Sequence, residues 1–170
     1  MIRRMVVLAA LAATLGGCVL QSRAPRYGDG ESVLALGETG GKARMSSWQN
    51  GAWAPDDESV EIKVAGKHYE AVAGSGSVTL YFVPLQDEWF IVQGSDASNP
   101  AVYMLAEVKQ RAAEIRTFGC SDLKKNPRVA AAIGFEGNDC YIKPDAAMKP
   151  LFMALLASPG EPVSRLEIVP

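Results

Sequence analysis

Histidine is the first residue type to consider for chemistry, because an imidazole serves as a general base or a metal ligand near neutral pH. The sequence holds one histidine, His68, among 170 residues. A metal centre or catalytic pair that needs two imidazoles is therefore excluded by count. A tight turn at Gly66-Lys67 puts His68 on the polar outer face of a strand pair. We therefore predict no catalytic residue, no metal and no cofactor, and we expect that the protein is not an enzyme.

Serine and phosphate chemistry are the next alternatives. The segment Gly74-Ser75-Gly76-Ser77 lacks the Gly-x-Ser-x-Gly pattern of a nucleophile elbow, so we predict a turn. Residues 37–42 end in Gly-Gly-Lys, but the phosphate-binding loop needs a hydroxyl after that lysine and the chain has Ala43. A hydrolase that uses two carboxylates alone stays open, since it needs only acids about 5–10 Å apart in a cleft.

The N-terminus has the composition of an export signal. Arg3 and Arg4 precede an apolar run over residues 5–15, which ends in Leu15-Gly16-Gly17-Cys18. This run of 11 residues is far shorter than the roughly 20 that span a bilayer. The pattern resembles the lipobox of bacterial lipoproteins. The resemblance implies cleavage before Cys18 and acylation of Cys18, with palmitate among the attached chains.

This resemblance sets the expected organisation of the chain. We predict a lipoprotein signal peptide over residues 1–17, a lipidated tether over 18–31, and one domain over 32–170. The tether is rich in Gly, Pro, Ser and charged residues, so we expect it to be flexible. The resemblance further implies that the protein is anchored to a membrane of the cell envelope by lipid and faces the periplasm or the cell surface.

The charge balance bears on the partners. The full chain has 17 basic and 19 acidic side chains, and removal of residues 1–17 takes away Arg3 and Arg4. The remaining 153 residues carry 15 basic and 19 acidic groups, a net charge of −4. Binding to a phosphate backbone requires a basic face, so nucleic acid is not an expected partner.

Two cysteines remain after Cys18, namely Cys120 and Cys140. In an oxidising compartment we expect them to form a structural disulfide. Closure of a loop of this length contributes about 3 kcal/mol in the chain-entropy model.

Alternating apolar residues and turn signals predict antiparallel strands from Val33 to Phe118. Asn50-Gly51 predicts a two-residue turn that places Trp48 opposite Trp53. The two indoles either stabilise the hairpin or form an exposed aromatic surface that binds a ring or a sugar. Both readings remain open.

The strands over residues 77–84 and 88–94 are apolar on both faces, so they belong to the core. We expect their turn at Gln86-Asp87, with Phe82 opposite Ile91. A helix over 145–157 has one apolar face. The predicted fold class is α+β: an antiparallel meander, with a strongly curved sheet or a half-barrel as the alternatives for its shape, packed by a C-terminal helix and held by one disulfide.

These features predict a membrane-anchored binding or assembly module with an envelope protein as its partner. The candidate contact residues are Ser75, Gly76, Trp48 and Trp53. The alternative rests on Ser75, Gly76 and Tyr81, a Ser-Gly loop ahead of a strand tyrosine, which resembles the periplasmic lysozyme inhibitors of bacteria. That resemblance implies inhibition of a lysozyme-like hydrolase.

Overall fold

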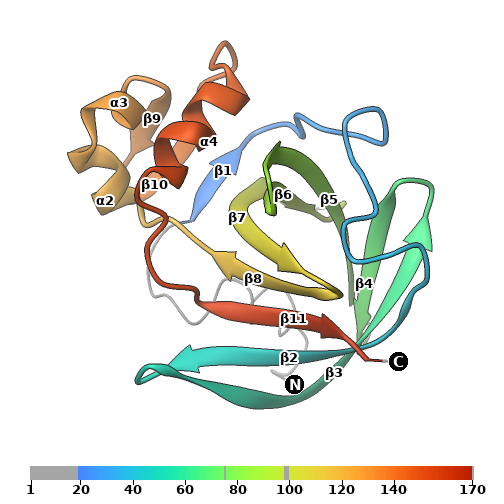
Figure 1. Ribbon diagram of the computed structural model, residues 1–170. Coiled ribbons are helices and arrows are strands. Elements are labelled where there is room, and N and C mark those ends of the chain that lie inside the picture. The colour runs from blue at the N-terminus through green and yellow to red at the C-terminus, as the bar shows by residue number, and fades with distance from the viewer. Residues whose placement is uncertain (1–18, 75, 98–99, 170) are drawn as a thin grey trace, which may run out of the picture.

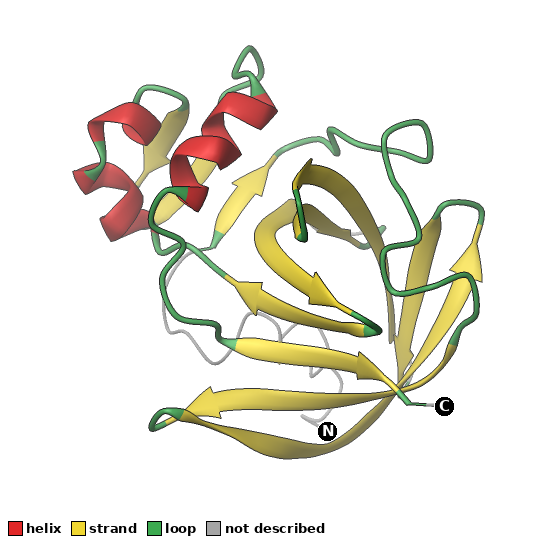
Figure 2. Cartoon of the chain, viewed as in Figure 1, coloured by secondary structure: helices red, strands yellow, loops and turns green. Residues whose placement is uncertain are grey.

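The computed structural model of the protein describes residues 19–74, 76–97 and 100–169, in which strands dominate and helices are short (Figures 1 and 2). The strands are β1 (Leu20–Ser22), β2 (Gly41–Gln49), β3 (Ala52–Ala65), β4 (His68–Ala73), β5 (Gly76–Gln86), β6 (Trp89–Ser95), β7 (Ala101–Lys109), β8 (Ala112–Arg116), β9 (Ile133–Glu136), β10 (Asp139–Ile142) and β11 (Ser164–Ile168). The helices are α2 (Cys120–Lys125), α3 (Pro127–Ala130) and α4 (Met148–Leu156).

Eight of these strands form a closed antiparallel barrel in the order β2-β3-β4-β5-β6-β7-β8-β11. Closure depends on the C-terminal strand β11, in which Ser164 pairs with Ser47 of β2 and with Ile115 of β8. The prediction of an antiparallel sheet is confirmed, but the sheet closes into a full barrel and so goes beyond the strongly curved sheet or half-barrel that was expected. The reason is that β11 joins two strands far apart in the sequence, which local patterns cannot reveal.

The barrel is filled by its own side chains. Alternate residues of its strands point inward and form one apolar core. The buried members are Leu36, Ala43, Met45, Val60, Ile62, Tyr69, Ala71, Ala73, Val78, Leu80, Phe82, Val92, Met104, Ala106, Val108, Ala113, Ile115, Leu166 and Ile168.

The segment before β2 closes one end of the barrel. Leu36 is fully buried in the barrel core, and its N–H donates to the Tyr69 hydroxyl at 2.9 Å. That hydroxyl donates in turn to the carbonyl of Gly37 at 2.9 Å. The N–H of Val33 donates to the carbonyl of Phe82. These bonds attach the segment to β4 and β5.

A second apolar core lies outside the barrel, between the wall formed by β5, β6 and β7 and a small subdomain of β1, β9, β10 and the three helices (Figure 1). Its buried members are Leu20, Val83, Ile91, Ala101, Tyr103, Leu105, Leu123, Val129, Ile133, Cys140, Ile142, Met148, Leu151, Phe152 and Leu155. The predicted C-terminal helix is therefore confirmed as α4, with a later start at Met148. Within this subdomain β1 pairs antiparallel with β7 and parallel with β10.

The β5–β6 hairpin is apolar on both faces as predicted, but the predicted register is wrong. Phe82 pairs with Val92 instead of Ile91, because the turn lies one residue later and an irregularity follows Pro84. Val92 therefore faces the barrel core, and Ile91 faces the outer core. A slip of one residue exchanges the two faces, and both faces of this hairpin accept apolar side chains.

The predicted flexible tether is also wrong for the residues that the structure describes. Leu20 is fully buried, and the side chain of Gln93 holds the chain after β1. The Oε1 atom of Gln93 accepts from the N–H groups of Arg26 at 2.8 Å and Tyr27 at 2.9 Å, and from the Tyr103 hydroxyl at 2.8 Å. Composition did not reveal this, because a few buried polar groups of the barrel wall hold the segment.

Replacement of Gln93 by Leu should release this segment. The change leaves the N–H of Tyr27 and the hydroxyl of Tyr103 without their acceptor, so we expect the free energy of unfolding to fall by about 2–4 kcal/mol. Urea denaturation measures the loss, and hydrogen exchange at Arg26 and Tyr27 shows whether the segment opens. Gln86→Leu, at an exposed position, is the control; an equal effect of both changes would contradict this role of Gln93.

Because two tyrosines are buried, we expect the folded protein to lose stability at alkaline pH. Burial raises the pKa of Tyr69 and of Tyr103 from 10.0 to about 12. A raised pKa in the folded state means that the folded chain holds these protons more tightly than the unfolded chain. The stabilisation is therefore complete below pH 10.0 and is lost as the pH rises towards about 12. Absorbance titration of the phenols, run beside circular dichroism, checks this, and Tyr69→Phe should reduce the slope of stability against pH.

Candidate functional site

The tip of the β2–β3 hairpin carries the two tryptophans that the sequence placed together. Asn50 and Gly51 have φ values of 51° and 79°, as a two-residue turn of this type requires. Trp48 pairs with Trp53, and their ring centroids lie 5.0 Å apart in an edge-to-face arrangement at 66°. The predicted register of this hairpin is confirmed.

One edge of the hairpin is held by the barrel and the other is open. On the β2 side, Ser47 pairs with Ser164, and the N–H of Trp48 donates to the carbonyl of Val163 at 3.0 Å. On the β3 side, pairing with β4 begins only at Glu61. The half of β3 nearest the tip therefore has no second partner strand in the described part of the chain.

The open edge has features that oppose pairing with another strand. Pro55 has no N–H to donate, and an irregularity after it lets β3 bulge away from β2. The bulge carries two aspartates, and Asp56 accepts a hydrogen bond from the Ser47 hydroxyl at 2.9 Å. Bulges, prolines and charges at an edge disfavour edge-to-edge association. The open backbone of β3 is therefore poorly suited to pair with a strand of another chain.

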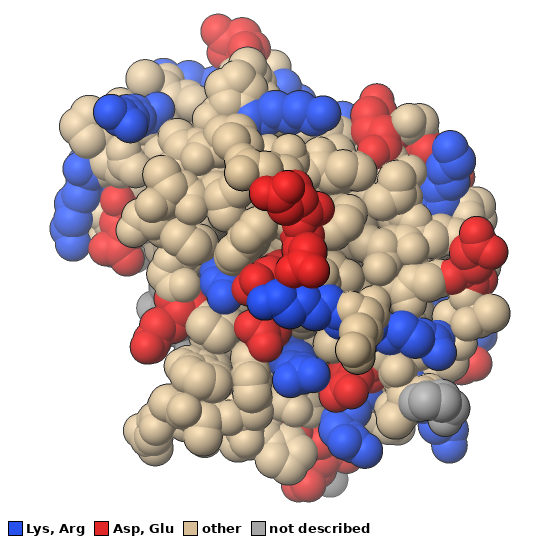
Figure 3. All heavy atoms as spheres, in the orientation of Figure 1, with Lys and Arg blue, Asp and Glu red and all other residues tan. Residues whose placement is uncertain are grey.

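The tip itself is uncharged. Residues 46–55 hold no Asp, Glu, Lys, Arg or His, in a chain of which 21% of residues are charged. Figure 3 shows this region at the lower left without blue or red atoms. The four residues of the turn, from Gln49 to Ala52, are exposed, and both tryptophans are partly buried. The Nε1 atom of Trp48 is buried and has no hydrogen-bond partner among the described residues.

His68 lies on the outer face of β4, but it is not fully open to solvent. Its side chain is 18% exposed, its Nδ1 lies 2.6 Å from Oδ1 of Asp29, and its ring centroid lies 4.9 Å from that of Tyr81. The hydrogen bond from His68 lowers the pKa of Asp29. Ser32 lies in the same segment as Asp29, but its hydroxyl donates to the carbonyl of Lys67 at 2.5 Å. These two hydrogen bonds therefore attach residues 29–32 to the β3–β4 turn and to the start of β4.

The sequence analysis did not reveal the pair of His68 and Asp29. Asp29 falls in the segment that was predicted to be unpacked, and 39 residues separate the two side chains. No local pattern connects them.

The other predicted contact residues lie elsewhere. Gly74 has a φ of 56° at the β4–β5 turn and Gly76 is exposed, while Ser75 lies outside the described residues. Tyr81 is five residues beyond Gly76 on β5, about 16 Å along the strand. The turn is also separated from Trp48, because Val72 pairs with Glu61, and Glu61 pairs with Lys42, six residues before Trp48 on β2. That spacing is about 20 Å along β2.

The outer wall holds an ion-pair cluster that the sequence analysis missed. The guanidinium of Arg116 lies 4.6 Å from the centroid of the Trp89 ring, 3.5 Å from the carboxylate of Glu107 and 3.9 Å from that of Glu114. Glu107 and Glu114 are direct neighbours across β7 and β8. A shared cation offsets the repulsion between two such carboxylates. This arrangement stabilises the wall, and its only sequence signal is alternation of charge along the strands.

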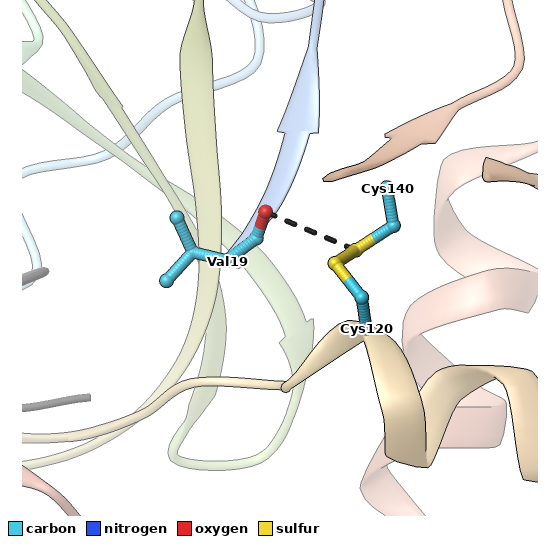
Figure 4. Close-up of a disulfide and its surroundings, with 3 residues drawn as sticks. All are labelled: Val19, Cys120 and Cys140. Carbon is cyan, nitrogen blue, oxygen red and sulfur yellow. Dashed lines mark hydrogen bonds between the residues drawn. A yellow bond between two sulfur atoms is a disulfide. The ribbon is translucent and has the colours of Figure 1, made fainter. Parts of the chain in front are cut away.

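The disulfide between Cys120 and Cys140 is confirmed, and it borders the point where the described chain begins (Figure 4). Val19 forms an isolated bridge with Gly119, and its carbonyl oxygen lies 3.9 Å from Sγ of Cys140. Leu20, the next residue, pairs with Cys140. The disulfide therefore joins the segment that bridges Val19 to the strand that pairs with Leu20. Cys18, the predicted lipidation site, lies outside the described residues.

Comparisons of the chain with protein-family models, curated proteins and solved structures find no match. Within the described residues there is no cluster of three or more His, Cys, Asp or Glu side chains arranged to hold a metal ion. None of the described helices has the length and hydropathy to cross a membrane.

Removal of the disulfide should loosen the start of the chain more than the barrel. We expect Cys120→Ala with Cys140→Ala to lower the free energy of unfolding by about 3 kcal/mol, since the unfolded chain gains freedom over this loop. Hydrogen exchange should rise at Leu20 and Gln21 and stay unchanged in β3 and β4. Faster exchange throughout the barrel would contradict a local role for the bridge.

Proposed function

We propose that the protein is a lipid-anchored module of the bacterial cell envelope that binds a partner through the tip of the β2–β3 hairpin and does not act as an enzyme. The observation that carries this proposal is the tip itself. It is uncharged, its turn is exposed, and its two tryptophans form an ordered pair at 5.0 Å. Aromatic residues are enriched in the contacts that proteins make with their partners.

The filled barrel supports a surface function. The residues that point inward pack against one another, and the segment before β2 covers one end through Leu36. A small molecule that binds within a barrel needs a lined cavity. A barrel with a packed apolar core instead provides a support for a projecting hairpin.

The anchor in this proposal rests on residues 15–18, Leu-Gly-Gly-Cys, and on the charged and apolar residues before them. Acylation at two positions gives stable attachment to a bilayer, whereas one chain holds a protein only weakly. Radiolabelled palmitate should label the native chain and not Cys18→Ser. Labelling of both proteins, or of neither, would contradict the anchor.

The binding surface can be tested by photocrosslinking in the native envelope. A photoreactive amino acid at Gln49, in the exposed turn, should give crosslinked products. The matched control is Lys63, which is exposed on the same strand, β3, but lies ten residues beyond Trp53. Products that are equally rare at both positions would contradict the tip as a contact surface.

The proposal also predicts no turnover. The purified domain should not hydrolyse an envelope substrate, and the His68→Ala variant should likewise show no hydrolysis. An activity that His68→Ala abolishes would overturn the non-enzymatic assignment.

Inhibition of a lysozyme-like hydrolase is the second candidate, and one observation favours it. The turn at Gly74 and Gly76 is exposed at the end of a hairpin, where it could enter a cleft. We favour the tryptophan tip, because Gly76 and Tyr81 lie well apart on β5. An assay of lysozyme with excess protein separates the two: unchanged lysis supports the tip, and strong inhibition supports the turn.

A further inference from the structure

We infer that the partner of the β2–β3 tip is the lipid bilayer itself, so that the domain contacts the membrane through both the lipid on Cys18 and the tryptophan pair. This inference rests on the proposed anchor and binding surface. It names the occupant of that surface.

The first step is that no free tether separates the lipid from the folded domain. Val19 is 8% exposed, bridges Gly119 and lies against the disulfide (Figure 4). Cys18 is the residue directly before it, and consecutive Cα atoms lie about 3.8 Å apart. An acyl chain on Cys18 therefore holds the domain itself at the headgroup region. Within the segment expected to act as a spacer, β1 pairs with β7, and the N–H groups of Arg26 and Tyr27 are held by Gln93 of the barrel wall.

The second step is that the tip lies on the same edge of the domain as Val19. Gly119 follows the end of β8 by three residues, and at that end β8, β11, β2 and β3 are adjacent in the sheet. Ile115 pairs with Ser164, and Ser164 pairs with Ser47, the residue before Trp48. The three strand spacings from β8 to β3 cover about 14 Å across the sheet. Figure 1 shows the start of β1, the end of β8, the start of β11 and the hairpin tip along its left side.

The third step is the chemistry of the tip. Tryptophan favours the interface between water and bilayer, because its ring is apolar and its N–H is polar. The absence of charge over residues 46–55 means that insertion removes no charged group from water. The acidic bulge after Pro55 lies further along β3, so attraction to anionic lipid is not the cause. We therefore expect the contact to be insensitive to salt.

The anchor also makes a weak second contact effective. Once lipid holds Val19 at the bilayer, insertion of the tip is an intramolecular step with a high effective concentration. A pair of tryptophans that would not hold a free protein at a membrane can then fix the orientation of an anchored one. The functional result is a domain with one defined face towards the bilayer.

Quenching of tryptophan fluorescence by brominated lipid tests the inference. The chain has three tryptophans, and Trp89 lies on the outer wall beside Arg116, three strands from Trp53 around the barrel. Trp48→Phe with Trp89→Phe leaves Trp53 as the reporter, and Trp48→Phe with Trp53→Phe leaves Trp89 as the matched control. Both variants keep an aromatic ring at each position, and circular dichroism checks their folding.

Each lipidated variant is placed in phosphatidylcholine vesicles with or without bromine on the acyl chains. We expect brominated lipid to lower the emission of Trp53 by about twofold or more, to leave that of Trp89 nearly unchanged, and to do so equally at low and high salt. A flexible Gly-Ser linker between Cys18 and Val19 should weaken the quenching of Trp53. Equal quenching of Trp53 and Trp89, or no effect of the linker, would overturn the inference.

The failures are distinguishable. Lipidated protein that sediments with the vesicles while Trp53 stays unquenched refutes bilayer contact and keeps the anchor. Crosslinks from Gln49 to a protein, or to a second copy of this chain, without quenching assign the tip to that partner instead. Absence of lipidation refutes the anchor and this inference together.

Discussion

Burial of one stretch of barrel wall on both of its faces is the constraint on which the rest of the structure depends. Alternate residues of β5, β6 and β7 point into the barrel core, and the residues between them point into the outer core. Phe82 and Val83, neighbours on β5, are both buried on opposite sides. A wall that is apolar on both faces must be covered on its outer face, so the outer subdomain is required by the barrel.

The same wall explains why the start of the chain is ordered. Gln93 is a fully buried polar residue on β6, and such a group must be hydrogen-bonded. Its partners are the backbone N–H groups of Arg26 and Tyr27 and the hydroxyl of Tyr103. The guanidinium of Arg26 then donates to the carbonyl of Ala146, in the segment before α4. The segment after β1 thus joins the barrel to the outer subdomain.

This attachment bears on orientation. In our proposal a lipid on Cys18 is attached next to Val19, which bridges Gly119 and lies beside the disulfide, so the domain has little freedom to rotate away from the membrane. A long flexible spacer would have allowed it to reach distant partners. The short connection instead favours contact with what lies at the bilayer surface, which is the basis for assigning the tryptophan tip to lipid.

Features that depend on neighbouring residues were predictable. The Asn50-Gly51 turn and the pairing of Trp48 with Trp53 follow from local backbone preferences, and α4 follows from its apolar period. The disulfide followed from counting, since one pairing remained after Cys18 was assigned to lipid. The sequence therefore predicted the hairpin that forms the candidate site, but it did not predict that this hairpin lies on the same edge of the domain as Val19.

The sequence by itself determined the strands of the barrel, the tightest turns, the single disulfide and the tryptophan pair, because each depends on residues that are close in the chain or on a count. The tertiary structure decided the closure of the barrel by β11, the register of β5 against β6 and the pair of His68 with Asp29. It also decided that the N-terminal segment is packed. Each of these depends on contacts between distant segments, and in the β5–β6 hairpin both faces are apolar, so periodicity could not choose between the two registers.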